Sequence, residues 1–119
     1  MDLGCRAGGP RRLTGDEFPL QRLLMRSPEL SGVIERRVLG PLEASPDLIT
    51  TVETMIANDM KRGAAADALH VHPSSVDYRM HRARELNGLD LSNPKDLALA
   101  VLAAEHRALG SRASPRSRR

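Results

Sequence analysis

Aromatic side chains are almost absent from this chain of 119 residues, which contains one Phe, one Tyr and no Trp. A hydrophobic core must therefore be built from Leu, Val, Ile, Ala and Met. Such residues suit packed helices better than a sheet, which usually draws on aromatic and β-branched side chains. The length fits a single small domain. We expect an all-α fold, a small helical bundle with no strand.

Cysteine and long apolar runs are also scarce. Cys5 is the only cysteine, so no internal disulfide can form, which fits a reducing compartment. The longest apolar run, Leu97 to Ala104, is far below the ~20 residues that cross a bilayer. No apolar stretch follows the arginines of the N-terminal leader, so it does not resemble a secretory signal. The sequence predicts a cytoplasmic protein with no membrane partner.

Positive charge is concentrated at the two ends, although the net charge is +3 and the pI is 9.7. The tail 111–119 holds four Arg, and residues 1–12 hold three Arg and one Asp, which leaves −3 for residues 13–110. Bulk basicity is thus poor evidence for nucleic-acid binding by the folded part. The tail has two interpretations, a basic arm making salt-dependent phosphate contacts or a terminus without a role.

Helix starts are marked where Ser or Asn precedes Pro, because the first caps a helix and the second fits its first position. Ser27-Pro28, Ser45-Pro46 and Asn93-Pro94 are such pairs. The expected helices span 18–25, 28–39, 46–57, 64–69, 73–87 and 94–110. We divide the chain into a disordered leader (1–15), an N-terminal helical segment (16–44), a helix-turn-helix domain (45–110) and a disordered basic tail (111–119).

The segment from residue 64 to 88 carries the most informative pattern. An Ala-rich helix is followed by the short connection His70-Val71-His72 and a second helix rich in Arg, Tyr and Ser. A helix-turn-helix has this order of parts, with the second helix free to enter a major groove. Small residues in the first helix permit close packing. His70 stands where many such turns have Gly in a left-handed conformation.

Periodicity divides the second helix into two faces at ~100° per residue. Val76, Met80 and Ala83 form the inward face, and Leu86 is expected to extend it. Polar and charged side chains occupy the outward face and its flanks. The candidate DNA-binding residues among them are Ser74, Ser75, Asp77, Tyr78, Arg79, His81 and Arg82.

Each side chain of this set has a chemical reason to be included. Ser74 and Ser75 occupy the helix start, where hydroxyls and free N–H groups can hold a phosphate. The arginines can bind phosphates or the acceptor edge of guanine, and Tyr78 can donate to a phosphate. Asp77 can accept from a cytosine amino group, or pair with His81. An amphipathic helix with a solvated charged face is the alternative interpretation.

Other kinds of site have little support in the sequence. His70, His72 and His81, with Asp77 nearby, lack the spacing and the cysteines of a usual zinc site. His72 can instead cap the helix that begins at Pro73. There is no Gly-rich phosphate loop and no supported Ser/His/Asp arrangement. We therefore expect no enzyme activity, no cofactor and no metal.

The same segment resembles the C-terminal helix-turn-helix domain of PucR-type (CdaR-like) bacterial transcription regulators. The matching motifs are Leu69-His70-Val71-His72, Ser74-Ser75-Val76, Tyr78-Arg79, Arg82 and Glu85-Leu86-Asn87-Gly88-Leu89-Asp90, with Arg37-Val38-Leu39-Gly40-Pro41-Leu42 upstream. The likeness covers roughly residues 34–106. It implies sequence-specific binding of double-stranded DNA by a homodimer, with Ser74, Ser75, Tyr78, Arg79 and Arg82 facing the DNA.

Some residues depart from that family's pattern. Ser74 stands where members often have Asn, while Pro73, Asp77 and His81 stand where many have Arg, which implies weaker binding or a different operator. Members resembling this chain carry a long sensory region before the domain, and 42 residues are too few for one. We expect either a stand-alone module or a piece of a longer regulator, with no small-molecule effector identifiable. The alternative function is a truncated helical interaction module that pairs with a full-length regulator.

Overall fold

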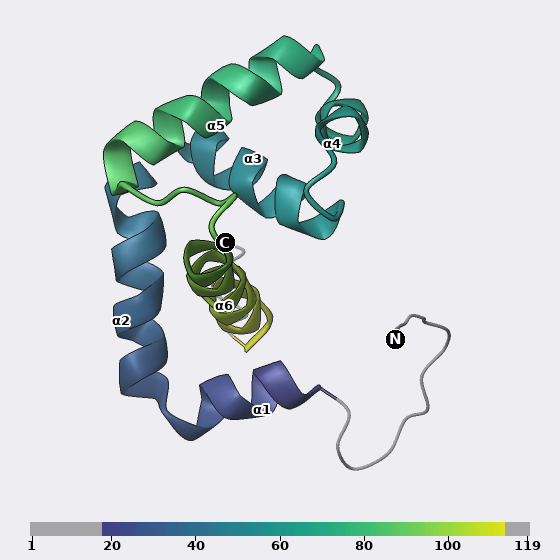
Figure 1. The fold of residues 1–119 in the computed structure, drawn as a ribbon. Coiled ribbons are helices and arrows are strands. Elements are labelled where there is room, and N and C mark those ends of the chain that lie inside the picture. The colour runs from purple at the N-terminus through teal and green to yellow at the C-terminus, as the bar shows by residue number, and fades with distance from the viewer. Residues whose placement is uncertain (1–17, 114–119) are drawn as a thin grey trace.

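A computed structural model describes residues 18–113, which form six α-helices and no strand (Figure 1). This result confirms the predicted all-α class. The leader 1–15 and the part of the tail beyond residue 113 lie outside the described residues. A 3-10 turn at Gly40–Leu42 follows the second helix. The helices are α1 (Pro19–Arg26), α2 (Pro28–Leu39), α3 (Pro46–Ala57), α4 (Arg62–Leu69), α5 (Pro73–Asn87) and α6 (Pro94–Ala113).

Proline sets most of the helix starts. It occupies the first position of every described helix except α4, where its fixed φ suits the helix and its missing N–H costs nothing. Helix α4 begins at Arg62 rather than at residue 64, after a loop in which Asp59 and Met60 both have positive φ. Helix α6 continues past Gly110, because that glycine does not adopt the left-handed conformation that ends many helices.

The core consists of two clusters that meet at Met80. The larger joins α2, α3, α5 and α6, and its most buried members include Val38, Leu39 and Leu42. The smaller joins α3, α4 and α5. Ala100 and Ala103 of α6 are fully buried, and their small side chains let α2 and α6 approach closely. The larger apolar residues Leu97, Val101 and Leu102 of the same helix are only half-buried.

Polar contacts attach α1 and α2 to the rest of the molecule. The buried Ser31 hydroxyl donates to the carbonyl of Leu24 at 2.9 Å, which satisfies a polar group inside the α1–α2 corner. Glu35 of α2 pairs with His106 of α6 at 2.6 Å, and Gln21 of α1 donates to Glu105 at 2.7 Å. The N-terminal helices are therefore fixed to α6.

Candidate nucleic-acid interface

The turn between α4 and α5 is built around a left-handed histidine. His70 has φ 60° and ψ 42°, and the N–H of Val71 returns to the carbonyl of Ala66 at 3.0 Å. The chain thereby reverses within three residues, and the half-buried Val71 packs against the smaller core cluster. The predicted left-handed conformation of His70 is confirmed, in a position where glycine would be easier to accommodate.

His72 caps the start of α5, as expected. Its Nδ1 accepts the N–H of Ser74 at 3.1 Å and lies 2.9 Å from the Ser74 hydroxyl. The N–H of Ser75 is bonded to the His72 carbonyl at 2.9 Å. The expectation that these N–H groups are free for a phosphate is therefore wrong, because the turn itself uses them. Among the described residues the Ser75 hydroxyl has no partner.

Alanine side chains hold α5 against α4. Ala65 and Ala66 are almost inaccessible and form the smaller core cluster with Val76 and Met55. Because a methyl group adds little bulk, the two helices approach closely along this line. The inward face of α5 is thereby fixed, and its opposite face is turned away from the core.

Most of the candidate DNA-binding residues are exposed on that opposite face. Tyr78 is 66% exposed, whereas Ser75 and Arg79 are half-buried. The other exposed candidates are Ser74, Asp77, His81 and Arg82. The outward orientation predicted from helical spacing is confirmed, while contact with DNA stays a prediction. Leu86 was expected on the inward stripe but is 37% exposed, because ten residues beyond Val76 the helix has turned about 80° short of three full turns.

Two acidic residues neutralise part of this surface. Glu85 pairs with Arg82 at 3.0 Å and with His81 at 3.1 Å, and the hydrogen bond from Arg82 is the largest effect holding the pKa of Glu85 below its usual range. Asp77 accepts a hydrogen bond from Nε of Arg62 on α4 at 2.8 Å. The pair between Asp77 and His81, one of the two alternatives that the sequence left open for Asp77, does not form, because Asp77 pairs with Arg62 and His81 with Glu85.

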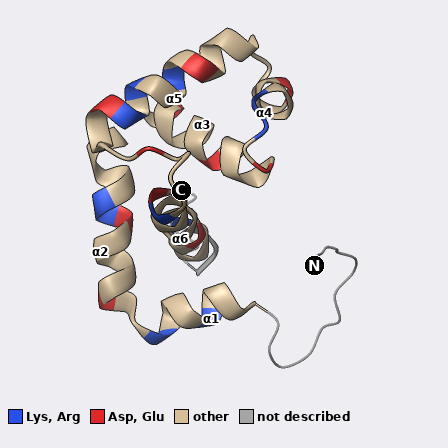
Figure 2. Cartoon of the chain, viewed as in Figure 1, with Lys and Arg blue, Asp and Glu red and all other residues tan. Residues whose placement is uncertain are grey.

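Arg79 differs from the other arginines of α5 in that its charge is not paired with an acidic side chain of the described residues. Arg82 is paired with Glu85, and Arg84 lies 3.5 Å from Asp90. Among the described residues Arg79 has no acidic partner. Along α5 the three arginines lie between the acidic residues Asp77 and Glu85 (Figure 2), so the surface is mixed in charge. Arg79 and the neighbouring Tyr78 are its most available donors.

The other end of α5 is tied to α2 and to the following loop. Gly88 ends the helix with φ 75°. The side-chain amide of Asn87 donates to the carbonyl of Val38 at 2.9 Å, and Arg37 donates to the carbonyl of Asn87 at 2.7 Å. These contacts fix the direction in which α5 leaves the core. In the sequence, Asn87 stands out only as part of the motif from Glu85 to Asp90, and nothing there indicates that it connects α5 to α2.

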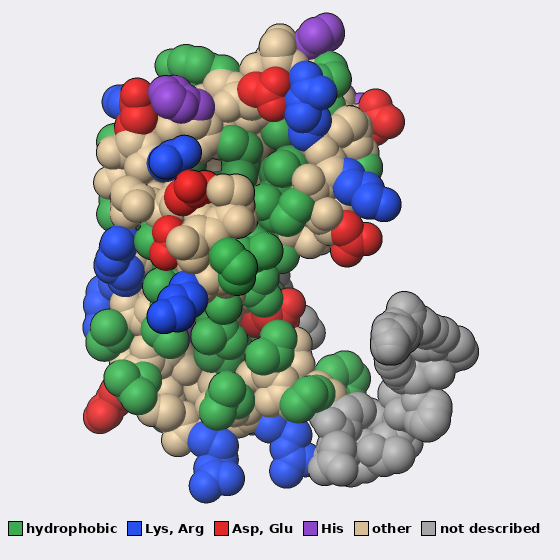
Figure 3. All heavy atoms as spheres, viewed as in Figure 1, with side chains coloured by type: hydrophobic (Ala, Val, Ile, Leu, Met, Phe, Trp, Pro, Cys, Tyr) green, Lys and Arg blue, Asp and Glu red, His purple; other side chains and the backbone are tan. Residues whose placement is uncertain are grey.

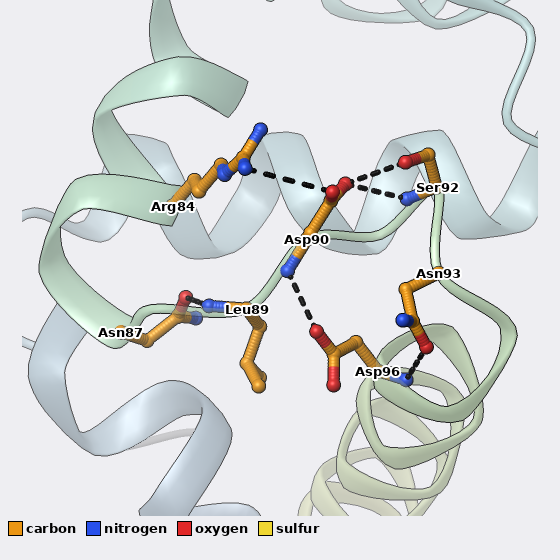
Figure 4. Close-up of polar contacts among 7 residues, drawn as sticks. All are labelled: Arg84, Asn87, Leu89, Asp90, Ser92, Asn93 and Asp96. Carbon is orange, nitrogen blue, oxygen red and sulfur yellow. Dashed lines mark hydrogen bonds and ion pairs between the residues drawn. The ribbon is translucent and has the colours of Figure 1, made fainter.

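A network of polar contacts orders the loop between α5 and α6 (Figure 4). Asp90 accepts from both the hydroxyl and the N–H of Ser92, at 2.6 and 3.0 Å. These bonds favour the ionised carboxyl and lower the pKa of Asp90. The N–H of Asp90 donates to Asp96 at 2.9 Å, and Asn93 accepts from the N–H of Asp96 at 3.4 Å. The start of α6 is thus fixed relative to the end of α5.

Sites of other kinds find no support in the described part of the chain. Within residues 18–113, no three or more His, Cys, Asp or Glu side chains are grouped so as to hold a metal ion. No helix in the same range is long and apolar enough to cross a membrane.

Comparison with known proteins agrees with this geometry. Residues 48–105 match the family model of the PucR C-terminal helix-turn-helix domain. An uncharacterized protein of Mycobacterium tuberculosis is 32% identical over 98 residues, which cover 82% of this chain and 24% of that protein. The transcriptional activator PmfR of Paenarthrobacter nicotinovorans is 34% identical over 85 residues, covering 68% and 18%.

A third relative is the proline-responsive transcriptional activator PutR of Bacillus subtilis, 33% identical over 51 residues, covering 43% of this chain and 12% of PutR. The chain thus spans about a quarter or less of the length of these relatives. No solved structure matches it. With its left-handed turn, capped second helix and matched sequence, the chain belongs to the PucR helix-turn-helix family through residues 48–105.

Proposed function

We propose that this chain is a sequence-specific DNA-binding module of a transcription regulator, with α5 as the helix that enters the major groove. The observation that carries the proposal is the exposed outward face of α5 on a PucR-type helix-turn-helix. Two relatives with this domain, PmfR and PutR, are transcriptional activators. Their function supports regulation by this chain, in the bacterial cytoplasm where the chromosome lies.

The shape of the molecule leaves α5 accessible. Helices α4 and α5 lie at one end and α1 at the other, with α2 running between them (Figure 1). A duplex can therefore approach the outward face of α5 without meeting the N-terminal helices. Because the second helix of a helix-turn-helix lies in the groove while the first crosses the backbone, α4 would face the phosphates beside that groove.

The side chains of α5 suggest different tasks. Arg79, which has no acidic partner among the described residues, is suited to a phosphate or to the O6 and N7 atoms of guanine. Tyr78 and Ser75 offer hydroxyl donors for phosphates. Arg82 must share its charge between Glu85 and DNA, so we expect it to contribute less than Arg79.

We further propose that the module acts as a homodimer through α1 and α2. Within the described residues, most of the large apolar side chains that are exposed lie on or next to these two helices: Phe18, Leu20, Leu23, Met25, Leu30 and Val33. Figure 3 shows hydrophobic side chains over the lower half of the molecule, where α1, the first part of α2 and α6 lie. Solvent exposure of such a group is typical of an interaction surface.

A second copy fits this surface by charge as well. Helix α2 carries Glu29 near its start and Arg36 near its end, both exposed. In an antiparallel pair of α2 helices crossing near Val33, Glu29 of each copy would lie beside Arg36 of the other. Such self-complementarity is the requirement of a two-fold interface. In such a pair the two α5 helices would lie at opposite ends of the dimer, because α5 is attached to the C-terminal end of α2.

Selection of bound sequences from a random DNA pool, followed by a double substitution, tests the DNA-binding proposal. Arg79→Ala with Arg82→Ala should lower affinity at moderate salt by at least tenfold. The slope of log K against log salt should fall by about 0.9 for each phosphate that the variant no longer binds. Arg26→Ala with Arg107→Ala removes the same charge from α1 and α6, and should change affinity much less.

The alternative is the helical interaction module that pairs with a full-length regulator. It predicts that no sequence is enriched from the pool and that both double variants bind DNA equally weakly. That outcome would end the regulator proposal. Binding to the full-length partner that survives the α5 substitutions but not changes on α1 and α2 would support the alternative instead.

A further inference from the structure

We propose that Asp77 is a positioning residue: it holds Arg62 of α4 over the DNA backbone and does not itself read a base. The inference rests on the proposed DNA-binding function and assigns a role to a residue outside α5. Arg62 opens α4, and Asp77 lies on the outward face of α5. Their pair is therefore the polar link between the two helices of the motif at the surface where DNA would lie.

The geometry of the pair leaves the outer part of the guanidinium available. Nε of Arg62 donates to Oδ1 of Asp77 at 2.8 Å, and both side chains are 54% exposed. The two Nη groups make no hydrogen bond with any described residue. An arginine presents five N–H donors in a fixed fork, so fixing Nε directs the remaining donors without using them. Two parallel bonds from these donors match a phosphate.

The position of α4 makes phosphate the natural ligand for those donors. In a helix-turn-helix the first helix crosses the DNA backbone while the second lies in the groove. Arg62 occupies the first residue of that first helix, and the exposed Lys61 precedes it. A fixed guanidinium at this place would add a phosphate contact from outside α5. Such contacts set the orientation of the protein on the duplex and carry no base preference.

Asp77 has two other interpretations that the pair makes testable. As a base reader it would accept from a cytosine amino group, but its Oδ1 is occupied by Arg62. As a plain acidic residue near DNA it would repel phosphates, so its removal would strengthen binding. An exposed ion pair stabilises a fold little. The effect of the Arg62–Asp77 pair is therefore best measured in DNA binding, because holding the Arg62 side chain in one orientation should strengthen its contact with a phosphate.

A double-mutant cycle separates these possibilities. The chain, Asp77→Ala, Arg62→Ala and the double variant are titrated with a duplex selected by the unmodified chain, at several salt concentrations. Asp77→Ala should weaken binding by about threefold, although it removes a negative charge. Its salt slope should fall by about 0.9, as for Arg62→Ala. In the Arg62→Ala background, the same Asp77 change should leave affinity unchanged or raise it.

Two more measurements complete the test. Asp77→Asn keeps an oxygen that accepts from Nε, so it should bind more tightly than Asp77→Ala. Base preferences selected by Asp77→Asn should equal those of the unmodified chain. Stronger binding of Asp77→Ala in both backgrounds, or a changed preference at one base pair, would overturn the inference. Failure of the unmodified chain to select any duplex would instead refute the proposed function, so the two failures are distinguishable.

Discussion

At the scale of single residues, His72 fills a position usually taken by Ser, Thr, Asp or Asn. Its ring nitrogen accepts the N–H of Ser74 and so satisfies one of the donors left over at the start of α5. The preceding His70 supplies the left-handed turn. His70 thus provides the backbone conformation of the turn, and His72 provides the hydrogen bond that caps α5. These two roles account for both histidines without a metal ion.

Replacing His72 by Ala should therefore destabilise the fold. Loss of a side-chain cap costs about 0.5–2 kcal/mol, and we expect the free energy of unfolding, measured by urea denaturation, to fall by that amount. His72→Asn is the matched control, because its carbonyl oxygen can accept the same N–H. Equal stability of the Ala variant and the unmodified chain would show that the cap contributes nothing.

Substitution by alanine should change the stability of the fold in opposite directions at Gly88 and at Gly110. Gly88 has φ 75° at the end of α5, so Gly88→Ala should destabilise by roughly 1–2 kcal/mol, the cost of a left-handed Cβ-bearing residue. Gly110 lies within α6 and has open space around it. Gly110→Ala should stabilise by about 0.5–1 kcal/mol. Thermal unfolding of the two variants measures both changes in stability. If both substitutions stabilised the fold, or both destabilised it, the prediction would be contradicted.

At the scale of elements, the starts of four helices were predictable and that of α4 was not. Pro28, Pro46, Pro73 and Pro94 each begin a helix as expected, because proline restricts the backbone wherever it occurs. Helix α4 has no such signal. Its start depends on a loop with positive φ at both Asp59 and Met60. Methionine rarely adopts a positive φ, so nothing in the sequence indicates that Met60 does so.

In the candidate site, too, some features were predictable from the sequence and others were not. The outward face of α5 followed from spacing along one helix. The partner of Asp77 did not, because Arg62 lies 15 residues away on another helix. Periodicity gives the direction of a side chain from its own helix axis, but not which neighbouring side chain it meets. The exposed position of Leu86 follows from the same spacing, because at ~100° per residue its side chain lies about 80° away from that of Val76 around the helix axis.

Packing of α4 against α5 should be sensitive to added volume. Ala65 has no exposed surface, so Ala65→Leu should force the helices apart and destabilise by about 1–3 kcal/mol. Ala68→Leu is the matched control, because Ala68 lies exposed on the same helix. Chemical denaturation compares the two. If the Ala65 variant were as stable as the control, the close contact of α4 and α5 would not be required.

At the scale of the whole molecule, the exposed apolar side chains of α1 and α2 predict self-association. Leu23→Gln with Leu30→Gln keeps the net charge and replaces side chains that are 59% and 63% exposed. We expect these substitutions to convert a dimer into a monomer with little loss of fold stability, as measured by analytical ultracentrifugation and circular dichroism.

Leu86→Gln is the control for that experiment, since Leu86 is exposed on α5 rather than on the proposed interface. It should leave the dimer intact. A monomeric unmodified chain at high concentration would refute the interface outright. A dimer that survives the double substitution would place the contact between copies elsewhere.

The paired bonds between the ends of α2 and α5 have a mechanical consequence. Asn87 donates to Val38 and Arg37 donates back to Asn87, so each helix end holds the other in both directions. We expect a rotation of the end of α2 to change the direction of α5, because both hydrogen bonds join these two helix ends. The direction in which α5 points is therefore set by the same joint that carries the N-terminal helices.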